Sequence, residues 1–259
     1  MNRNRKMSSR KEVQAHGLIW QDELMLTTYR ATRQETDTIP YTSDIDLPAE
    51  YNRLDHCDLS IKTTGSNTVC MADCLRQFDL VSSGKPIHMV VIHYKQKGNT
   101  KNILSITEID LTNSAQLLFG SLTREQIQCL VSLVKKVPSN RKPTKTEHGH
   151  LYELKDALQQ LSGVMCLNIK CNSTQSRLQC SLKRFQQFIE DHPERVISKG
   201  NHEFRGGSIT PQLVSCPRVL KPKAGPKNGL KSKAGLKPKA GPKPKADPKN
   251  GPKPKKPKV

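Results

Sequence analysis

The sequence predicts an α/β fold in which a central mixed β-sheet is flanked by helices. Two runs read as paired strands: Ile87–Tyr94 is the most apolar run in the chain, and Ile103–Leu111 alternates between apolar and polar residues. A basic turn that contains Gly98-Asn99 joins them. Apolar residues at helical spacing stand before and after these strands, and they predict helices that cover the sheet. With 259 residues, the chain has room for one domain of moderate size or two small ones.

The first predicted helix runs from Val13 to about Arg33, where apolar residues recur at near-helical spacing. A polar, turn-rich region follows this helix. Within it, Ser43–Pro48 reads as a short extended piece that the proline ends or places at a sheet edge. The strand Leu59–Lys62 comes next, and a polar glycine turn separates it from a helix that begins near Cys70. The segment Ser82–Pro86 ends this helix before the central strand.

The C-terminal half predicts three helices, a second hairpin and a loop. The first of these helices has Ser121 or Thr123 as its N-cap and an apolar stripe that ends at Val134. The remaining segments, in chain order, are a basic loop at 138–150, a helix at 151–161, hairpin strands at 164–170 and 177–183, a helix from Phe185 to Pro193, and a loop at 204–207.

Positive charge is concentrated near the C-terminal end of the sequence. The chain carries 43 lysines and arginines against 23 acids, which gives a net charge of +20. Residues 221–259 contain fourteen lysines and one acid, so they hold +13 of this charge and leave +7 for the rest. The heptapeptide Lys-Pro-Lys-Ala-Gly-Pro-Lys occurs at 221 and again at 237. Such a segment has almost nothing apolar to bury, so it predicts a disordered tail with affinity for polyanions.

These features divide the chain into a disordered basic arm at 1–12, a folded domain at 13–218 and the disordered Lys/Pro-rich tail at 219–259. No run of 18 apolar residues predicts a membrane span, and the basic N-terminus lacks the apolar core of a signal peptide. The eight cysteines form neither a Cys-x-x-Cys pair nor a zinc-finger pattern with histidines. They favour reduced core thiols, so we expect an intracellular protein that is not secreted and has no membrane partner.

The residues with the clearest chemistry lie in the stretch Leu59–Asp73. Ser60 and Lys62 are two residues apart, so they share one face of a strand, while Leu59 and Ile61 take the other face. Cleavage of a phosphodiester needs a metal held by carboxylates and a cation near the attacked phosphate, and Lys62 supplies such a cation. No histidine is placed in the sequence to activate Ser60 as a nucleophile.

The acids near this strand are candidate metal ligands. Asp44 and Asp46 lie two residues apart in the preceding extended piece, Asp58 lies two residues before the Ser-x-Lys pair, and Asp73 follows the glycine turn. Asp46 and Asp73 are the preferred ligands, with Asp44 and Asp58 as alternates. All four reach the strand or its ends if the extended piece pairs with it and the helix folds back over it.

This order of residues resembles the PD-(D/E)XK nuclease superfamily, in which an acid, a hairpin and an acid-x-Lys strand precede a helix. Ser60 stands in place of the middle acid, as in a subset of type II restriction endonucleases that take the missing carboxylate from the following helix. Asp73 occupies that region, although no proline precedes either acid of the extended piece. Asp22 and Glu23 make the first helix similar to the acidic first helix of the superfamily, which places one of them at the metal site. By themselves, these two acids read as a solvated turn.

The resemblance implies a magnesium-dependent, site-specific endonuclease with a restriction-endonuclease-like core, acting on double-stranded DNA as a twofold homodimer. It implies catalytic roles for Asp46, Ser60, Lys62 and Asp73, with Mg²⁺ bound by Asp46 and Asp73 and no small-molecule cofactor. The tail resembles those of proteins from large algal DNA viruses, some of which encode restriction endonucleases. That similarity implies the host cytoplasm or nucleus, or a virion, as the location.

Base readers in such an enzyme are polar side chains that face the major groove. The predicted readers are Asn172, Gln175, Arg177 and Gln179 on the second hairpin, and Arg205 in the late loop. Each is equally consistent with a phosphate contact or with a plain surface residue. Two other classes of protein stay open: a histone-like DNA binder driven by the tail, and a repair or junction nuclease of the same fold. Deletion of the tail distinguishes a histone-like binder from a nuclease. A panel of substrates distinguishes a repair or junction nuclease from a restriction endonuclease.

Overall fold

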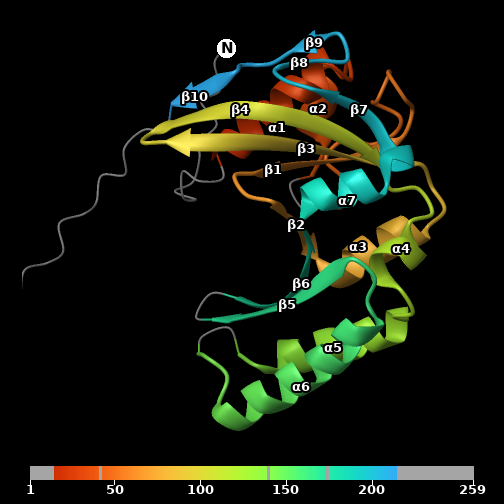
Figure 1. The fold of residues 1–259 in the computed structure, drawn as a ribbon, viewed down its shortest axis with the longest axis vertical. Coiled ribbons are helices and arrows are strands. Elements are labelled where there is room, and N and C mark those ends of the chain that lie inside the picture. Colours follow the sequence, from red (N-terminus) through yellow and green to blue (C-terminus); the bar gives the residue numbers. More distant parts are fainter. Residues whose placement is uncertain (1–14, 41–42, 139–140, 173–174, 215–259) are drawn as a thin grey trace, which may run out of the picture. The chain divides into compact units, whose positions relative to one another are not determined.

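The computed structural model describes residues 15–40, 43–138, 141–172 and 175–214 (Figure 1). It is an α/β structure with a mixed central sheet and flanking helices, so the predicted fold class is confirmed at this level. The arm predicted at 1–12 and the tail predicted at 219–259 lie outside the described residues. Among the helices of the described ranges, none combines the length and the apolar character that crossing a membrane requires.

The central sheet is built around strands β3 (Ile87–Lys97) and β4 (Thr100–Asp110), which form the predicted hairpin. Strand β1 (Asp58–Thr64) contains the predicted Ser-x-Lys strand and runs parallel to β3. On its other edge, β4 pairs antiparallel with β7 (Val196–Gly200) and, further along, with β10 (Gln212–Val214). These two C-terminal strands complete the sheet, and the sequence analysis did not predict them.

A second, three-stranded sheet differs from the sequence prediction in one element. Its antiparallel order is β2 (Thr68–Asp73), β6 (Gln175–Lys183) and β5 (Met165–Asn172), and the last two strands are the predicted second hairpin. The predicted helix is present as α3 (Cys74–Ser82), but its predicted start near Cys70 is wrong, because residues 68–73 form β2. Alternate residues of the first part of β2 are buried, which is the period of a strand.

One face of the central sheet packs against helix α1 (Ala15–Thr27). Leu59 and Ile61 of β1 are buried on this face, as the sequence predicts. The same apolar cluster contains Trp20 and Tyr29, both of which are fully buried. The Trp20 indole N–H donates to the carbonyl of Thr210 at 2.8 Å, so α1 is also tied to a segment near the end of the described chain.

The opposite face of the central sheet packs against α3. Side chains alternate between the two faces of a strand, and paired residues of parallel neighbours share a face. Ser60 pairs with Met89, and Lys62 pairs with Val91. Both partners are buried in the apolar cluster that also contains residues of α3, α5 and the second sheet. Ser60 and Lys62 therefore belong to the face opposite α1.

Helix α1 is shorter than predicted. It ends at Thr27, and Arg30 adopts a left-handed conformation (φ 61°) that a right-handed helix does not pass through. A separate helix α2 (Arg33–Thr38) begins at a capping box whose N-cap is Thr32. The start predicted at Val13 lies outside the described residues.

Helices α5 (Arg124–Lys136) and α6 (Lys145–Leu161) lie side by side against β6 and β5 (Figure 1). Thr123 is the N-cap of α5, which confirms one of the two predicted caps. Helix α6 begins before its predicted start at Leu151. Thr144 is the N-cap of a capping box, and the helix therefore has additional turns at its N-terminal end. The basic loop predicted at 138–150 is therefore partly helical.

The remaining short elements connect and close the two sheets. Helix α7 (Phe185–Asp191) is the predicted last helix, and a 3₁₀ turn η1 (Pro193–Arg195) follows it. The loop predicted at 204–207 is instead the turn of a small hairpin of β8 (Glu203–Phe204) and β9 (Gly207–Ser208). Arg205 and Gly206 both have positive φ (50° and 81°), the geometry of a tight hairpin turn. Helix α4, which follows β4, spans Ala115–Phe119.

Candidate functional site

Strand β1 brings together two of the predicted catalytic residues. The Nζ of Lys62 lies 3.2 Å from Oδ2 of Asp46, and their side chains are 22% and 25% exposed. The backbone N–H of Ile61 donates to the same Oδ2 at 2.6 Å, and Nε2 of Gln21 donates to Oδ1 at 3.1 Å. The carboxylate is therefore held from β1 and from α1, and it remains partly open to solvent.

Backbone pairing explains why Asp46 reaches Lys62. Leu47 forms an isolated antiparallel bridge with Leu59, and the N–H groups of Asp46 and Leu47 both donate to the Leu59 carbonyl. The bridge is formed by the short extended piece that the sequence predicts before Pro48. Because the piece runs antiparallel to β1, its residue Asp46 lies next to the residues that follow Leu59.

Ser60 and Asp58 occupy positions with other roles. Ser60 is only 2% exposed and lies on the face of β1 that packs toward α3, so its side chain is part of the packed interior. The Asp58 carboxylate accepts a hydrogen bond from the backbone N–H of Ala49 at 3.0 Å. Asp58 therefore stabilises the turn after Pro48, which in turn supports the extended piece that carries Asp46.

Asp73 and Asp44 are linked through the first turn of α3. Asp73 is the N-cap of this helix, and its carboxylate accepts a hydrogen bond from the Arg76 N–H at 3.1 Å. The Arg76 guanidinium in turn forms an ion pair with Asp44. Since Asp44 lies two residues before Asp46 in the sequence, the N-terminus of α3 stands near the Asp46–Lys62 pair. Asp73 therefore has a capping role whatever its role toward a metal.

The two acids of the first helix have partners away from β1. Asp22 pairs with Arg33 at 3.2 Å, and Glu23 accepts hydrogen bonds from the N–H and the hydroxyl of Thr210 at 2.7 and 2.8 Å. The alternative in which one of these acids faces the metal site is therefore not supported. Their neighbour Gln21 is the residue of α1 that contacts Asp46.

The donor set at β1 suits a hard cation that keeps most of its water. Mg²⁺ is usually held by one or two carboxylates together with waters and substrate phosphates. Asp46 offers a partly exposed carboxylate whose Oδ1 receives one hydrogen bond, from Gln21, and keeps a further lone pair. Within the described residues, no group of three close His, Cys, Asp or Glu donors includes Asp46. A cation at this position would therefore be held by the Asp46 carboxylate together with water or substrate oxygens.

The predicted base readers of the second hairpin fall into two groups. Asn172 and Gln175 are paired at its end, where β5 turns into β6. Arg177 is exposed on β6, whereas Gln179 is only 7% exposed. In the amide orientation that satisfies its hydrogen bonds, the Gln179 oxygen accepts from the Arg177 guanidinium at 2.9 and 3.1 Å. Gln179 thus orients Arg177, and Arg177 is the side chain that faces solvent.

Arg205 lies in a second polar cluster, which the sequence analysis missed. Its Nη1 donates to Oδ2 of Asp55 and Oε2 of Glu108, both at 2.6 Å, and its Nη2 donates to Oδ1 of Asp55 at 2.8 Å. Although burial opposes its charge, these hydrogen bonds raise the pKa of Arg205 above its ordinary value. Both acids engage this guanidinium in the structure, and the role of Arg205 as a base reader stays a prediction.

Two strand residues complete this second cluster. Glu108 is fully buried, and its Oε1 lies 3.0 Å from Nδ1 of His88. Donor atoms of Asp55, Cys57 and His88 all lie within 4.8 Å of one another. Burial, with the charge of Asp55 next in effect, raises the pKa of Cys57 to about 12, so its thiol is not a ready nucleophile. A glutamate at an inward position of an alternating strand was the signal in the sequence that could have revealed this cluster.

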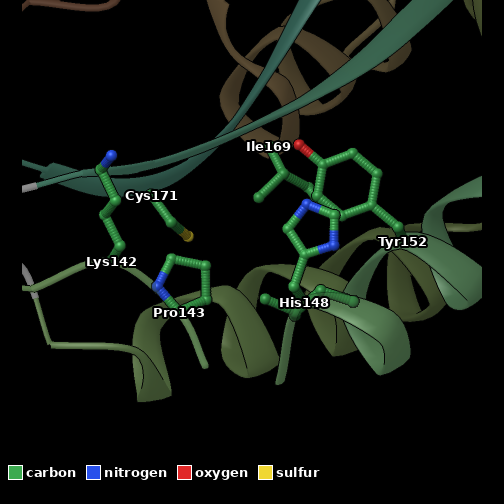
Figure 2. A pocket seen from close by; sticks show the side chains of 7 residues that line it. Lys142, Pro143, His148, Tyr152, Ile169 and Cys171 are labelled. Carbon is green, nitrogen blue, oxygen red and sulfur yellow. The ribbon is translucent and has the colours of Figure 1, made fainter. Parts of the chain in front are cut away.

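Two surface pockets accompany these clusters. One, of about 240 Å³, lies between α6 and β5 (Figure 2). His148 and Tyr152 stack there with ring centroids 4.1 Å apart, and Lys142 and Cys171 lie nearby (Figure 2). The other pocket, of about 540 Å³, lies beyond the C-terminal end of β1, and residues 93–96 of β3 form part of its wall. Neither of these two pockets is lined by Lys62 or Asp46.

Comparisons place the chain in no known group. Neither protein-family models, nor curated proteins, nor solved structures give a significant match to this sequence or fold. Its own residues define an α/β protein in which Lys62 of the edge strand β1 pairs with a carboxylate of the preceding extended piece.

Proposed function

We propose that this protein is a magnesium-dependent, site-specific endonuclease that hydrolyses phosphodiester bonds in double-stranded DNA, on a core of the restriction-endonuclease type. The observation that carries the proposal is the 3.2 Å contact between Lys62 and Asp46, residues separated in sequence and brought together by the Leu47–Leu59 bridge. A lysine and a carboxylate held side by side are the two groups that metal-assisted phosphodiester hydrolysis needs most.

Each protein group has a defined task in this proposal. A bound magnesium ion supplies Lewis-acid chemistry at the phosphate and lowers the pKa of a bound water. Asp46 holds that ion, and the N–H of Ile61 and the amide of Gln21 keep the carboxylate in position. Lys62 places its ammonium beside the attacked phosphate, where it stabilises the charge that develops. Ser60 takes no direct part, since it is buried on the α3 face.

Binding of DNA is proposed to use charge first and side-chain contacts second. The net charge of +20 favours a polyanion and predicts affinity that falls steeply as salt increases. Arg177 is exposed on β6 and, with Asn172 and Gln175 at the hairpin end, is the proposed contact to base edges or phosphates. A twofold dimer that cuts both strands of a palindrome, in an algal virus or its host, belongs to the same proposal.

A plasmid digest tests the proposed activity directly. Supercoiled plasmid is incubated with the full chain in Mg²⁺, and in parallel with a chelator, and the products are separated on a gel. Discrete bands that require Mg²⁺ are the expected result, because a site-specific enzyme cuts at few positions. A smear identifies a non-specific nuclease, and retarded but intact plasmid identifies a histone-like binder, so either result overturns the proposal as stated.

Asp73 is the residue for which capping and metal binding must be separated. Serine caps a helix about as well as aspartate but lacks a carboxylate, so Asp73→Ser is expected to keep the stability of the protein within a few tenths of a kcal/mol. Asp73→Ala is expected to cost about 1 kcal/mol through loss of the cap. If Asp73 is the second metal ligand, Asp73→Ser folds normally but loses cleavage, as measured by thermal unfolding and by the plasmid digest. Wild-type cleavage by Asp73→Ser removes Asp73 from the ligand set.

A further inference from the structure

The second cluster lies on the α1 face of the central sheet, opposite the face to which Lys62 belongs. His88 pairs with Leu59 across β1 and β3, and Leu59 is buried in the α1 cluster, so the side chain of His88 belongs to that face. Asp55 and Cys57 come from the turn that leads into β1, and their donor atoms lie within 4.8 Å of that of His88. One carboxylate, one thiol and one imidazole therefore converge at a single point.

The sulfur of Cys57 is held in position by a buried amide. Cys57 is 1% exposed, and Nδ2 of the fully buried Asn52 donates to its Sγ at 3.4 Å and to its carbonyl at 3.0 Å. Outer-sphere N–H groups of this kind orient a ligating group and stabilise its charged form.

The imidazole of His88 is oriented in the same manner. Oε1 of the fully buried Glu108 lies 3.0 Å from its Nδ1. A carboxylate behind a histidine is the usual outer-sphere partner of a metal-binding imidazole, because it fixes the tautomer and the ring orientation. Arg205 in turn binds both Glu108 and Asp55, so each acid of the cluster has a fixed position.

The hydroxyl of Tyr29 is buried beside the same cluster. Burial, followed by the charge of Glu108, raises the pKa of Tyr29 well above its ordinary value, so this group stays protonated.

The chemistry of the three donor atoms indicates which kind of ion fits this position. Mixed sulfur, nitrogen and oxygen donors select zinc-class ions and not Mg²⁺, which prefers oxygen alone.

We propose that Asp55, Cys57 and His88 form a binding site for one zinc-class divalent ion, with a structural role. Such an ion joins the turn before β1 to β3 and, through Glu108 and Arg205, to β4 and the β8–β9 hairpin. The site is separate from the magnesium position proposed at Asp46, because its residues belong to the opposite face of the sheet. The existence of this site does not depend on the proposed nuclease activity.

Cobalt titration tests the site without any measurement of cleavage. The full chain is reduced, stripped with a chelator and titrated with Co²⁺ under nitrogen. One equivalent is expected to give the near-ultraviolet charge-transfer band of a thiolate–cobalt bond, and Zn²⁺ is expected to displace it. Zn²⁺ is also expected to raise the thermal unfolding temperature of the stripped protein, since a ligand that binds only the folded state stabilises it.

Matched cysteine variants identify the thiol. Cys57→Ser is expected to lose the band and to weaken Zn²⁺ binding by more than about 100-fold, since loss of an outer-sphere partner alone costs roughly 10- to 100-fold. Cys74→Ser is the control, because Cys74 is also fully buried and lies beside a second thiol, that of Cys180. His88→Gln serves as a second ligand variant if circular dichroism shows that Cys57→Ser does not fold. Absence of stoichiometric binding, or a band that survives Cys57→Ser and disappears in Cys74→Ser, overturns the proposal.

Discussion

Replacement of Lys62 by alanine is expected to reduce Mg²⁺-dependent DNA cleavage by at least about 100-fold, because the preorganised cation beside the attacked phosphate is lost. DNA affinity is expected to change little, since Lys62 is one charge in a chain of net charge +20. Its Nζ contacts Asp46, so Asp46→Asn is expected to give the same loss and to weaken the dependence on Mg²⁺. Single-turnover cleavage and a gel-shift titration measure the two effects separately.

The control for this variant is Lys85→Ala. Lys85 is an exposed lysine in the loop before β3, so its removal takes away the same charge without touching β1. It is expected to cleave at the wild-type rate. Equal cleavage by Lys62→Ala and Lys85→Ala contradicts the assignment of Lys62 and, with it, the nuclease proposal.

Replacement of Arg205 by methionine is expected to produce the largest loss of stability. Methionine keeps an unbranched apolar stem but removes the guanidinium and the charge that compensates Asp55 and the fully buried Glu108. A buried ion pair that loses one partner leaves an uncompensated charge, at a cost of about 3–5 kcal/mol. Chemical denaturation of protein treated with a chelator measures this cost. The denaturant concentration at the midpoint is lowered, and the slope of the unfolding free energy against denaturant is unchanged.

A surface arginine gives the matched comparison. Arg124 also binds a carboxylate through two nitrogens, that of Asp79, but both side chains are largely exposed. Arg124→Met is therefore expected to change the midpoint far less than Arg205→Met does. Adding Glu108→Gln to Arg205→Met is expected to recover part of the stability, because the buried charge is then absent. No recovery in the double variant contradicts the electrostatic explanation.

Much of the central sheet could be predicted from the sequence because its residues carry strong local signals. The β3–β4 hairpin and the β5–β6 hairpin follow from apolar and alternating runs around polar turns. Strand β2 was missed because six residues between a turn and a helix carry too little pattern to separate the two periods. Strands β7 and β10 are short. They form because they pair with the distant β4, and their local sequence alone does not favour a strand.

The candidate site was only partly predictable for the same reason. Asp46 and Lys62 could be named because both residue types serve the same chemistry and their segments adjoin in sequence. The cluster of Asp55, His88, Glu108 and Arg205 joins residues up to 150 positions apart, and no spacing rule connects them. Asp73 was ambiguous for a different reason. An acid at the start of a helix is explained equally well by capping and by metal binding, so the sequence does not separate the two roles.

The contacts of β4 also determine when the chain can reach its final form during synthesis. Within the described residues, β7 and β10 cover its outer edge, and the carbonyl of Thr210 accepts the hydrogen bond of the Trp20 indole. Until residues 196–214 have left the ribosome, the nascent chain exposes an unpaired strand edge and an incompletely packed first helix, both of which invite self-association. Folding of the central sheet is therefore completed late, after almost all of the described chain has been translated.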